Sequence, residues 1–356
     1  MTDVLSRREL NRATLARQHL LERAPAGALD LIEHLAGMQA QAPLAPYVGL
    51  WTRLRDFAPE TLSTLIEQRK VVRIHLMRAT VHLVGARDAL DWRPLFDPPL
   101  DKVFRGEFDE AAVARRAATL LAERPRTRAE LGRLLASEWP GVDPTSLAYA
   151  ATNSLALCQV PPRGVWGSTG PAAWAPVEAW LGAPLRTVPV DGLVLRYLGA
   201  FGPASVPDIQ AWSGLTRLRE VVERLPLRAF RAESGQPLYD LPDAPRPGAE
   251  VPAPVRFLPE YDNLLLAHRD RARVIPHRRP VPLPPGNGAT TGTVLLDGLW
   301  QGTWRFRHGV LRISPFVAVP EAERAALRTE GGRLAAFLSP GTTGDVVLEE
   351  PRQAAG

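Results

Sequence analysis

The 356-residue sequence predicts an α+β fold, and three observations lead to this prediction. First, stretches with apolar residues at helical spacing are followed by shorter stretches in which apolar and polar residues alternate, as in strands. Second, this order of helices and a hairpin recurs until about residue 245. Third, prolines cluster from Pro242, and the last hundred residues are strand-like. Helices closed by a hairpin form a winged helix, so we expect three tandem winged-helix units and a β-rich C-terminal domain.

The first unit, placed at residues 1–105, should begin with an amphipathic helix over residues 6–23. A second helix contains Leu31, Ile32, Leu35 and Met38 at helical spacing, and a third is expected over Pro59–Gln68. Alternation over residues 71–84 then predicts two short strands that are joined near Met77–Ala79. We therefore expect the first wing to be this hairpin.

The second helix leads into a short segment that holds two glutamines, Gln39 and Gln41. Gly37 is suited to end the helix, and Pro43 disfavours the α conformation in the residue before it. In an extended segment, residues two apart point the same way, so we expect both amides to face one place and Ala40 to face inward. An amide cannot act as a general base, but it can orient a water molecule. The alternative is that both glutamines make only local hydrogen bonds.

The second and third units repeat the pattern more loosely. In the second unit, residues 106–188, Thr127 and Glu130 resemble a capping box at the start of a helix. The expected elements of this unit are Arg126–Leu135, Pro144–Leu157 and a wing over Val160–Trp166. The expected elements of the third unit, residues 189–245, are helices over Gly192–Ala200, within Gly202–Gly214 and over Leu215–Arg224, and a wing over Phe230–Leu241.

After a proline-rich linker, residues 246–356 should form the β-rich domain. Asp297-Gly298 is a two-residue turn sequence that predicts a hairpin over Val294–Phe306. Further strands are expected over Val310–Val317 and Asp345–Leu348, with one helix over Glu321–Leu338.

Composition limits the chemistry. The formal net charge of +5 and the pI of 9.8 favour polyanionic partners. Only two lysines, Lys70 and Lys102, offer side-chain amines for covalent catalysis. The single cysteine, Cys158, excludes an intramolecular disulfide and a thiolate-rich metal site, and its apolar surroundings predict a buried structural thiol. The N-terminus lacks a signal-peptide pattern, and no stretch is apolar enough to span a membrane, so we expect a soluble, cytoplasmic protein without cofactor or metal.

Four segments together resemble the winged-helix DNA glycosylases of the AlkZ and YcaQ type. They are Gln39-Ala-Gln41, His75–His82, Leu258–Leu266 and Asp297–Trp304. The resemblance implies three winged helices that line a concave, basic DNA cradle, and hydrolysis of the N-glycosidic bond of alkylated purines. It also implies that Gln39 and Gln41 are the catalytic pair. Because Gln41 stands at the second position, where the YcaQ branch has aspartate, the chain is similar to the AlkZ branch.

Members of that branch protect antibiotic producers from their own DNA-alkylating products, including crosslinking agents. The resemblance therefore implies a monofunctional glycosylase for N7- or N3-alkylated purines in double-stranded DNA. Small methyl groups, bulky adducts and interstrand crosslinks are all open as substrates. The protein is expected to act as a monomer. A covalent lyase mechanism is disfavoured because Lys70 precedes the first wing and Lys102 lies beyond it.

Basic side chains on the wings and near the C-terminal domain are candidates for DNA contacts. They are His75, Arg78 and His82 on the first wing, Arg163 at the tip of the second, and Arg271, Arg273, Arg278 and Arg279 in the densest basic run. The alternatives are a structural Arg78, a solvated Arg163 and internal ion pairs within the run. Glu260 and Asp262 are spaced as paired carboxylates could be, but we expect them to be structural and to orient neighbouring arginines.

Two other functions fit parts of this pattern. A non-catalytic DNA-binding protein, such as a transcriptional regulator, would use the same winged helices and basic charge. It would not require paired amides, and such proteins usually dimerise to read half-sites. A sequestration protein would bind a free toxin without DNA.

Overall fold

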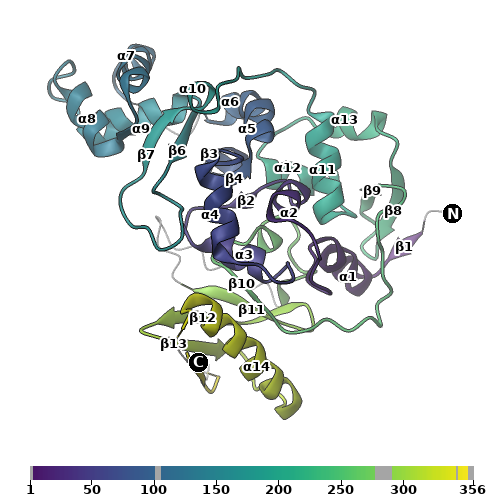
Figure 1. Ribbon diagram of the computed structural model, residues 1–356. Coiled ribbons are helices and arrows are strands. Elements are labelled where there is room, and N and C mark those ends of the chain that lie inside the picture. Colours follow the sequence, from purple (N-terminus) through teal and green to yellow (C-terminus); the bar gives the residue numbers. More distant parts are fainter. Residues whose placement is uncertain (1–2, 101–105, 277–290, 342–343, 352–356) are drawn as a thin grey trace.

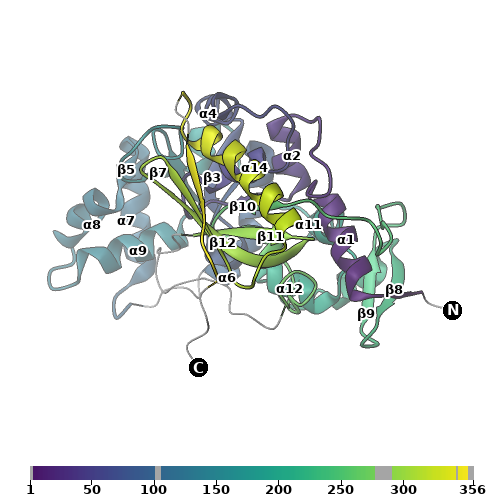
Figure 2. The same cartoon turned by 90° about the horizontal axis from the view of Figure 1, so that it is seen from below.

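The computed structural model describes residues 3–100, 106–276, 291–341 and 344–351. Helices and three separate β-sheets occur along the chain, so the fold is α+β, as the sequence predicts. Figures 1 and 2 show one group of helices, α7–α9, at one end of the molecule and a small hairpin, β8 and β9, at the opposite end. The C-terminal sheet lies between these ends in both views.

The first unit begins with helix α1 (Arg7–Arg17), in which Ser6 and Glu9 form a reciprocal capping box. The helix ends earlier than predicted, and two residues later His19 adopts a left-handed conformation with φ 52°. The remaining elements are α2 (Ala28–His34), β2 (Met38–Gln39), α3 (Ala45–Trp51), α4 (Pro59–Glu67), β3 (Val71–His75), β4 (Val81–Gly85), α5 (Ala86–Trp92) and α6 (Asp97–Leu100). The hairpin of β3 and β4 confirms the predicted strand pair.

Gly37 separates α2 from β2, as predicted. Its φ of +87° lies in the region that favours glycine, and a Cβ atom there would lie 2.6 Å from Cγ1 of Val84. The chain can therefore turn sharply out of the helix and pair with β4 at once.

The second unit contains helix α7 (Glu110–Glu123), which is an addition to the predicted elements. The others are β5 (Arg126–Thr127), α8 (Arg128–Ala136), α9 (Pro144–Ser154), β6 (Leu157–Val160), β7 (Ala173–Pro176) and α10 (Val177–Leu181). The capping box of Thr127 and Glu130 is confirmed. The second wing differs from the predicted Val160–Trp166. Its first strand, β6, ends at Val160, and its second strand, β7, begins only at Ala173.

The hairpins of these two units form one sheet rather than two separate wings. Its strand order is β2-β4-β3-β6-β7-β5. The two units meet where β3 pairs antiparallel with β6, with Arg73 opposite Gln159 and Ile74 opposite Cys158. Without this pairing each hairpin would expose a free edge, and the pairing satisfies backbone groups on both.

The third unit contains α11 (Asp191–Phe201), α12 (Val206–Ser213), α13 (Arg219–Arg224), β8 (Arg228–Ala232) and β9 (Pro237–Asp240). The predicted order of helices and hairpin is thus observed. Strand β1 (Val4–Leu5) adds to the hairpin by pairing parallel with β8. The N-terminal strand therefore completes a three-stranded sheet in the third unit.

The C-terminal domain is one five-stranded sheet with a helix packed against it. Its elements are β10 (Arg256–Leu258), β11 (Gly292–Leu296), β12 (Leu299–Arg307), β13 (Val310–Pro315), α14 (Glu321–Leu338) and β14 (Asp345–Leu348). Asp297 and Gly298 both have positive φ, as a tight hairpin turn requires. Leu327 and Leu334 of α14 join Leu311 and Ile313 of β13 in one buried cluster.

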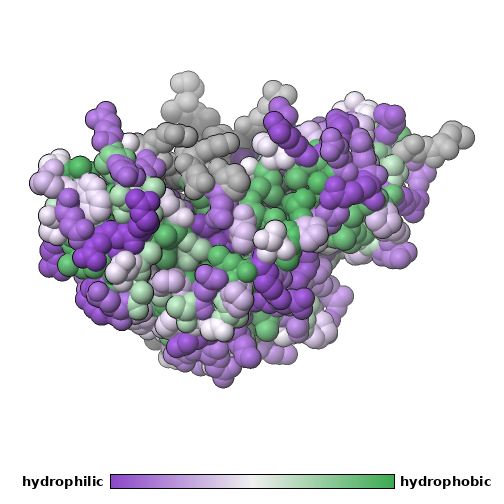
Figure 3. Space-filling model, turned by 90° about the horizontal axis from the view of Figure 1, so that it is seen from above, coloured by the Kyte–Doolittle hydropathy of each residue, from purple (hydrophilic) through white to green (hydrophobic). Residues whose placement is uncertain are grey.

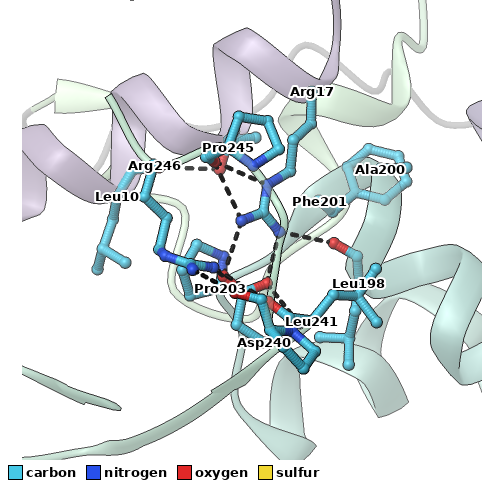
Figure 4. Close-up of polar contacts among 12 residues, drawn as sticks. Leu10, Arg17, Leu198, Ala200, Phe201, Pro203, Asp240, Leu241, Pro245 and Arg246 are labelled. Carbon is cyan, nitrogen blue, oxygen red and sulfur yellow. Dashed lines mark hydrogen bonds and ion pairs between the residues drawn. The ribbon is translucent and has the colours of Figure 1, made fainter. Parts of the chain in front are cut away.

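The proline-rich linker is held against helix α1 by a buried ionic cluster (Figure 4). Arg17 donates to both carboxylate oxygens of Asp240, at 2.6 and 2.7 Å, and Arg246 donates to one of them at 2.5 Å. The side chains of Arg17 and Asp240 are fully buried. Arg17 also donates to the carbonyl oxygens of Leu198 and Pro245, so this cluster joins α1, α11, β9 and the linker.

The visible surface is mainly hydrophilic, and apolar side chains gather near the middle of the face in Figure 3. Within the described residues, no helix has the length and apolar character to cross a membrane. Cys158 is buried, and burial raises the pKa of its thiol to about 12. The thiol is therefore structural, as predicted.

Candidate active site

The Gln39–Gln41 segment lies at the edge of the six-stranded sheet. Gln39 pairs with His82 of β4, and the N–H of Ala40 donates to the carbonyl oxygen of Val81 at 2.7 Å. The chain is therefore extended over β2, pairs with β4 as far as Ala40, and bends at Gln41. Ala40 is fully buried, as the sequence predicts.

Hydrogen bonds to the protein hold both amides. Nη2 of Arg78 donates to Oε1 of Gln39 at 2.8 Å, and the N–H of Val81 donates to Oε1 of Gln41 at 3.1 Å. A carbonyl oxygen has two lone pairs, so each can accept a second hydrogen bond. Fixed carbonyl groups of this kind can orient a water molecule without removing its proton.

Arg73 of β3 fixes the backbone between the two glutamines. Its Nη2 donates to the carbonyl oxygen of Ala40 at 2.7 Å, and its Nε donates to Oε1 of Gln159 at 3.1 Å. The arginine is only 2% exposed. Burial, and then the charge of Arg163, lower the pKa of Arg73 to about 10, so it is still a cation at neutral pH.

A small cavity of about 20 Å³ lies beside Gln39 and has space for a water molecule. Its wall includes Gln39, Arg53, Asp262 and Asn263. Arg53 and Asp262 form a buried bidentate ion pair with both N–O distances at 2.9 Å. Asp262 is therefore structural, as expected, and it orients an arginine far away in the sequence rather than a neighbouring one.

A second cavity of about 350 Å³ lies beside Gln41, between the first and second units. Its wall includes Gln41 and three arginines, Arg73, Arg128 and Arg163. Gln41 lines this larger cavity and Gln39 lines the smaller one. The amide oxygen of Gln39 is bonded to Arg78, and that of Gln41 to the backbone of β4.

Of the three first-wing candidates for DNA contacts, His75 and His82 are buried and Arg78 is partly buried. His82 is fully buried and His75 is 8% exposed, and burial is the main cause that lowers their pKa values to about 3 and about 4. Arg78 donates to Gln39, to Asn263 and to the carbonyl oxygen of Trp212. It thus joins the first wing to the third unit and the C-terminal domain, which fits the structural alternative.

The other candidates differ in exposure. Arg163 lies in the loop between β6 and β7 and lines the larger cavity. Arg271 is exposed, whereas Arg273 is 7% exposed and donates to the carbonyl oxygen of Pro203. Arg278 and Arg279 lie outside the described residues. Arg163 and Arg271 are therefore the two described candidates of this set that remain accessible to DNA.

Arg73 and Arg128 are site residues that the sequence analysis does not single out. Arg128 is the first residue of α8. A cation is unfavourable at the positive end of a helix, so an arginine in the first turn is a signal that could have drawn attention to it. Arg73 gives no comparable signal, because arginine on an alternating strand usually faces solvent.

No group of three or more His, Cys, Asp or Glu side chains could hold a metal ion in the part of the chain that the structure describes. Glu260 gives no sign of pairing with Asp262, which is occupied by Arg53. Burial raises the pKa of the Glu260 carboxyl group. The site therefore consists mainly of amides, guanidinium groups and aromatic rings.

Comparison with known proteins places this site in a family context. Residues 32–337 match the model of the AlkZ-like DNA glycosylase family. Among solved structures, the chain matches the Streptomyces sahachiroi DNA glycosylase AlkZ with a TM-score of 0.72 and 18% sequence identity, covering 98% of this chain and 100% of that one. At this identity the match shows a shared fold. A search of curated proteins finds no match.

Proposed function

The chain belongs to the AlkZ-like DNA glycosylase family, and we propose that it hydrolyses the N-glycosidic bond of cationic N7- or N3-alkylated purines in double-stranded DNA. In this proposal Gln39 and Gln41 position the attacking water. The observation that carries it is the Gln39–Gln41 segment, whose side-chain carbonyl groups and backbone are fixed by Arg78, Arg73 and β4.

The chemistry suits a pair of neutral amides. Alkylation at N7 or N3 gives the purine a positive charge, so the base leaves as a neutral molecule and takes the bonding electron pair with it. The sugar then has oxocarbenium character at C1′, and water adds there and releases a proton to solvent. A strong base is unnecessary for such an electrophile, whereas fixed dipoles that orient the water still lower the barrier.

Water, rather than an amine, is the proposed nucleophile. Lys70 is exposed and lines neither of the two cavities, and Lys102 lies outside the described residues. The reaction would thus stop at an abasic site, as in a monofunctional glycosylase.

We further propose that three winged-helix units, at residues 1–105, 106–188 and 189–245, form the DNA cradle. The net charge of +5 supports the proposal that this surface binds DNA, which is a polyanion. Bulky adducts or interstrand crosslinks, encountered in self-resistance to a DNA-alkylating product, are the finer substrate proposal. A comparison of small and bulky lesions as substrates tests this finer proposal.

The test is release of base from two duplexes, one with 7-methylguanine and one with a bulky N7-guanine adduct. Alkaline cleavage of the abasic site is the readout. We expect the Gln39→Ala/Gln41→Ala double variant to lose at least 100-fold in rate, because both water-orienting dipoles are removed, while DNA binding stays intact. Gln68→Ala is the matched control, since Gln68 is exposed at the end of α4.

Full activity of the double variant would exclude the proposed role of the glutamines. If the wild-type protein binds both duplexes but releases neither base, the result favours the non-catalytic DNA-binding alternative. The ratio of the two rates shows whether small or bulky lesions are preferred.

A further inference from the structure

The larger cavity beside Gln41 has a strongly unbalanced charge. Three guanidinium groups line it, from Arg73, Arg128 and Arg163, and none of the described residues in its wall is aspartate or glutamate. Like charges within a poorly solvated space repel one another, and the charge of Arg163 is one cause of the lowered pKa of Arg73. The cavity therefore holds a surplus of positive charge that the protein does not neutralise.

Neutral groups, rather than acids, fix these arginines in place. Arg128 lies 4.2 Å from the ring centroid of Tyr149 and 5.0 Å from that of Trp174, and its Nε donates to Oγ1 of Thr152 at 3.0 Å. Nη1 of Arg163 donates to the carbonyl oxygen of Gly170 at 3.0 Å. Such contacts hold the side chains in position and leave their charge uncompensated.

The wall also has hydrogen-bond donors in surplus. Nε of Arg163 and Nε1 of Trp174 are buried, and neither has an acceptor in the described part of the structure. The start of helix α8 lies in the same wall, through Thr127, Arg128 and Ala129, and adds the positive end of a helix. The carboxylate of Glu130 at this helix start is already held by Thr127 and Arg124.

This charge decides which part of a DNA substrate the cavity can take. A cationic alkylpurine would meet three further positive charges, so the cavity disfavours the damaged base. A phosphodiester is an anion with acceptor oxygens, and it matches both the charge and the surplus donors. A volume of about 350 Å³ also leaves room for the adjoining sugar or for bridging water.

We propose that the cavity lined by Arg73, Arg128 and Arg163 binds one backbone phosphate of the DNA strand next to the lesion. Gln41 lines the same cavity, and successive nucleotides of a DNA strand are about 3.4 Å apart along the duplex axis. The bound phosphate therefore lies within one or two nucleotides of the sugar that Gln41 addresses. This inference rests on the proposed glycosylase function and adds the anchor that sets the position of the lesion.

The experiment replaces individual phosphates with neutral methylphosphonates at each position within two nucleotides of the lesion. The duplexes contain 2′-fluorinated 7-methylguanine, which resists hydrolysis, so that binding is measured without turnover. We expect one position to weaken binding of the wild-type protein about tenfold. In Arg128→Gln the native duplex should bind about tenfold more weakly, and the methylphosphonate at that position should have little further effect.

Arg115→Gln is the matched control, because Arg115 is an exposed arginine of α7 that does not line the cavity. Arg163→Gln repeats the test if thermal unfolding shows that Arg128→Gln is misfolded. Equal losses at every position in the wild-type protein and both variants would overturn the phosphate site. Base release from hydrolysable DNA is measured in parallel: its absence would refute the glycosylase, whereas normal release without a coupled position would refute only this inference.

Discussion

Two clusters of arginines in this protein have opposite electrostatic settings. Around Asp240, Arg17 and Arg246 share one carboxylate, and every charge in the cluster has a partner (Figure 4). Around the cavity beside Gln41, Arg73, Arg128 and Arg163 face one another without an acid. The residue type is the same in both, so arginine content alone does not separate a structural cluster from a binding site. The presence or absence of a carboxylate does.

The largest effect is expected from Asp240→Ala. This change leaves Arg17 buried without a counter-charge and removes the partner of Arg246. Breaking a buried ion pair from one side should lower the free energy of unfolding by about 3–5 kcal/mol. Denaturant unfolding followed by circular dichroism measures it.

Asp243→Ala is the control, since Asp243 is exposed and lies three residues further along the linker. Equal losses for Asp240→Ala and Asp243→Ala would show that the ion pairs of Asp240 with Arg17 and Arg246 do not stabilise the fold. The comparison between the two arginine clusters would then fail.

Arg73→Gln should lower the free energy of unfolding less than Asp240→Ala does, but it should also lower the rate of base release. This change removes the donor to the carbonyl oxygen of Ala40. Loss of a buried hydrogen bond should lower the free energy of unfolding by about 1–3 kcal/mol. The Gln39–Gln41 backbone then loses its fixed position, and the single-turnover rate at saturating DNA should fall about tenfold.

Saturating DNA removes any change in affinity from this rate, so the measurement isolates positioning. Arg115→Gln again serves as the control. A rate equal to wild type, with stability reduced, would make Arg73 a structural residue with no part in the chemistry.

The sequence predicts local features of the site well and its long-range features poorly. Gly37 signals the end of α2, and strand β2, which holds Gln39, follows directly after it. The joining of both hairpins through β3 and β6 depends on residues 86 positions apart, such as Arg73 and Gln159, and no local pattern encodes that pairing. Whether an arginine has an acid beside it is likewise a property of the folded chain.

The first wing shows the same limit. Alternation correctly predicts strands β3 and β4, but it also suggests that His75 and His82 lie on a polar face. Both are buried, and the ring of His75 lies against Trp174 of the second unit. Periodicity identifies two faces of a strand, but it cannot tell when a second unit covers the polar one.

The smallest expected effect is a shift in the pKa of His75, which also lines the larger cavity and therefore reports on the charge of its arginines. Its ring centroid lies 5.1 Å from that of Trp174. Its pKa is lowered to about 4 by burial first and then by the charge of Arg128, with a smaller effect from Arg93, while a hydrogen bond that the ring donates to the backbone of Thr152 opposes the shift. Because the pKa of His75 is lower in the folded protein than the value of about 6.5 in the unfolded chain, the folded state favours the neutral imidazole. The resulting stability is present above about pH 6.5 and is lost as the pH falls toward 4, by about 3 kcal/mol in full.

Arg128→Gln removes one of the charges that oppose protonation of His75. We therefore expect the pKa of His75 to rise, while burial keeps it below 6.5, and the loss of stability near pH 5 to become smaller. Titration of the His75 ring protons by NMR measures the shift, with Arg115→Gln as the reference. If the pKa of His75 is the same in both variants, Arg128 exerts no appreciable field in the cavity, and the electrostatic contrast between the two arginine clusters is too weak to select a phosphate.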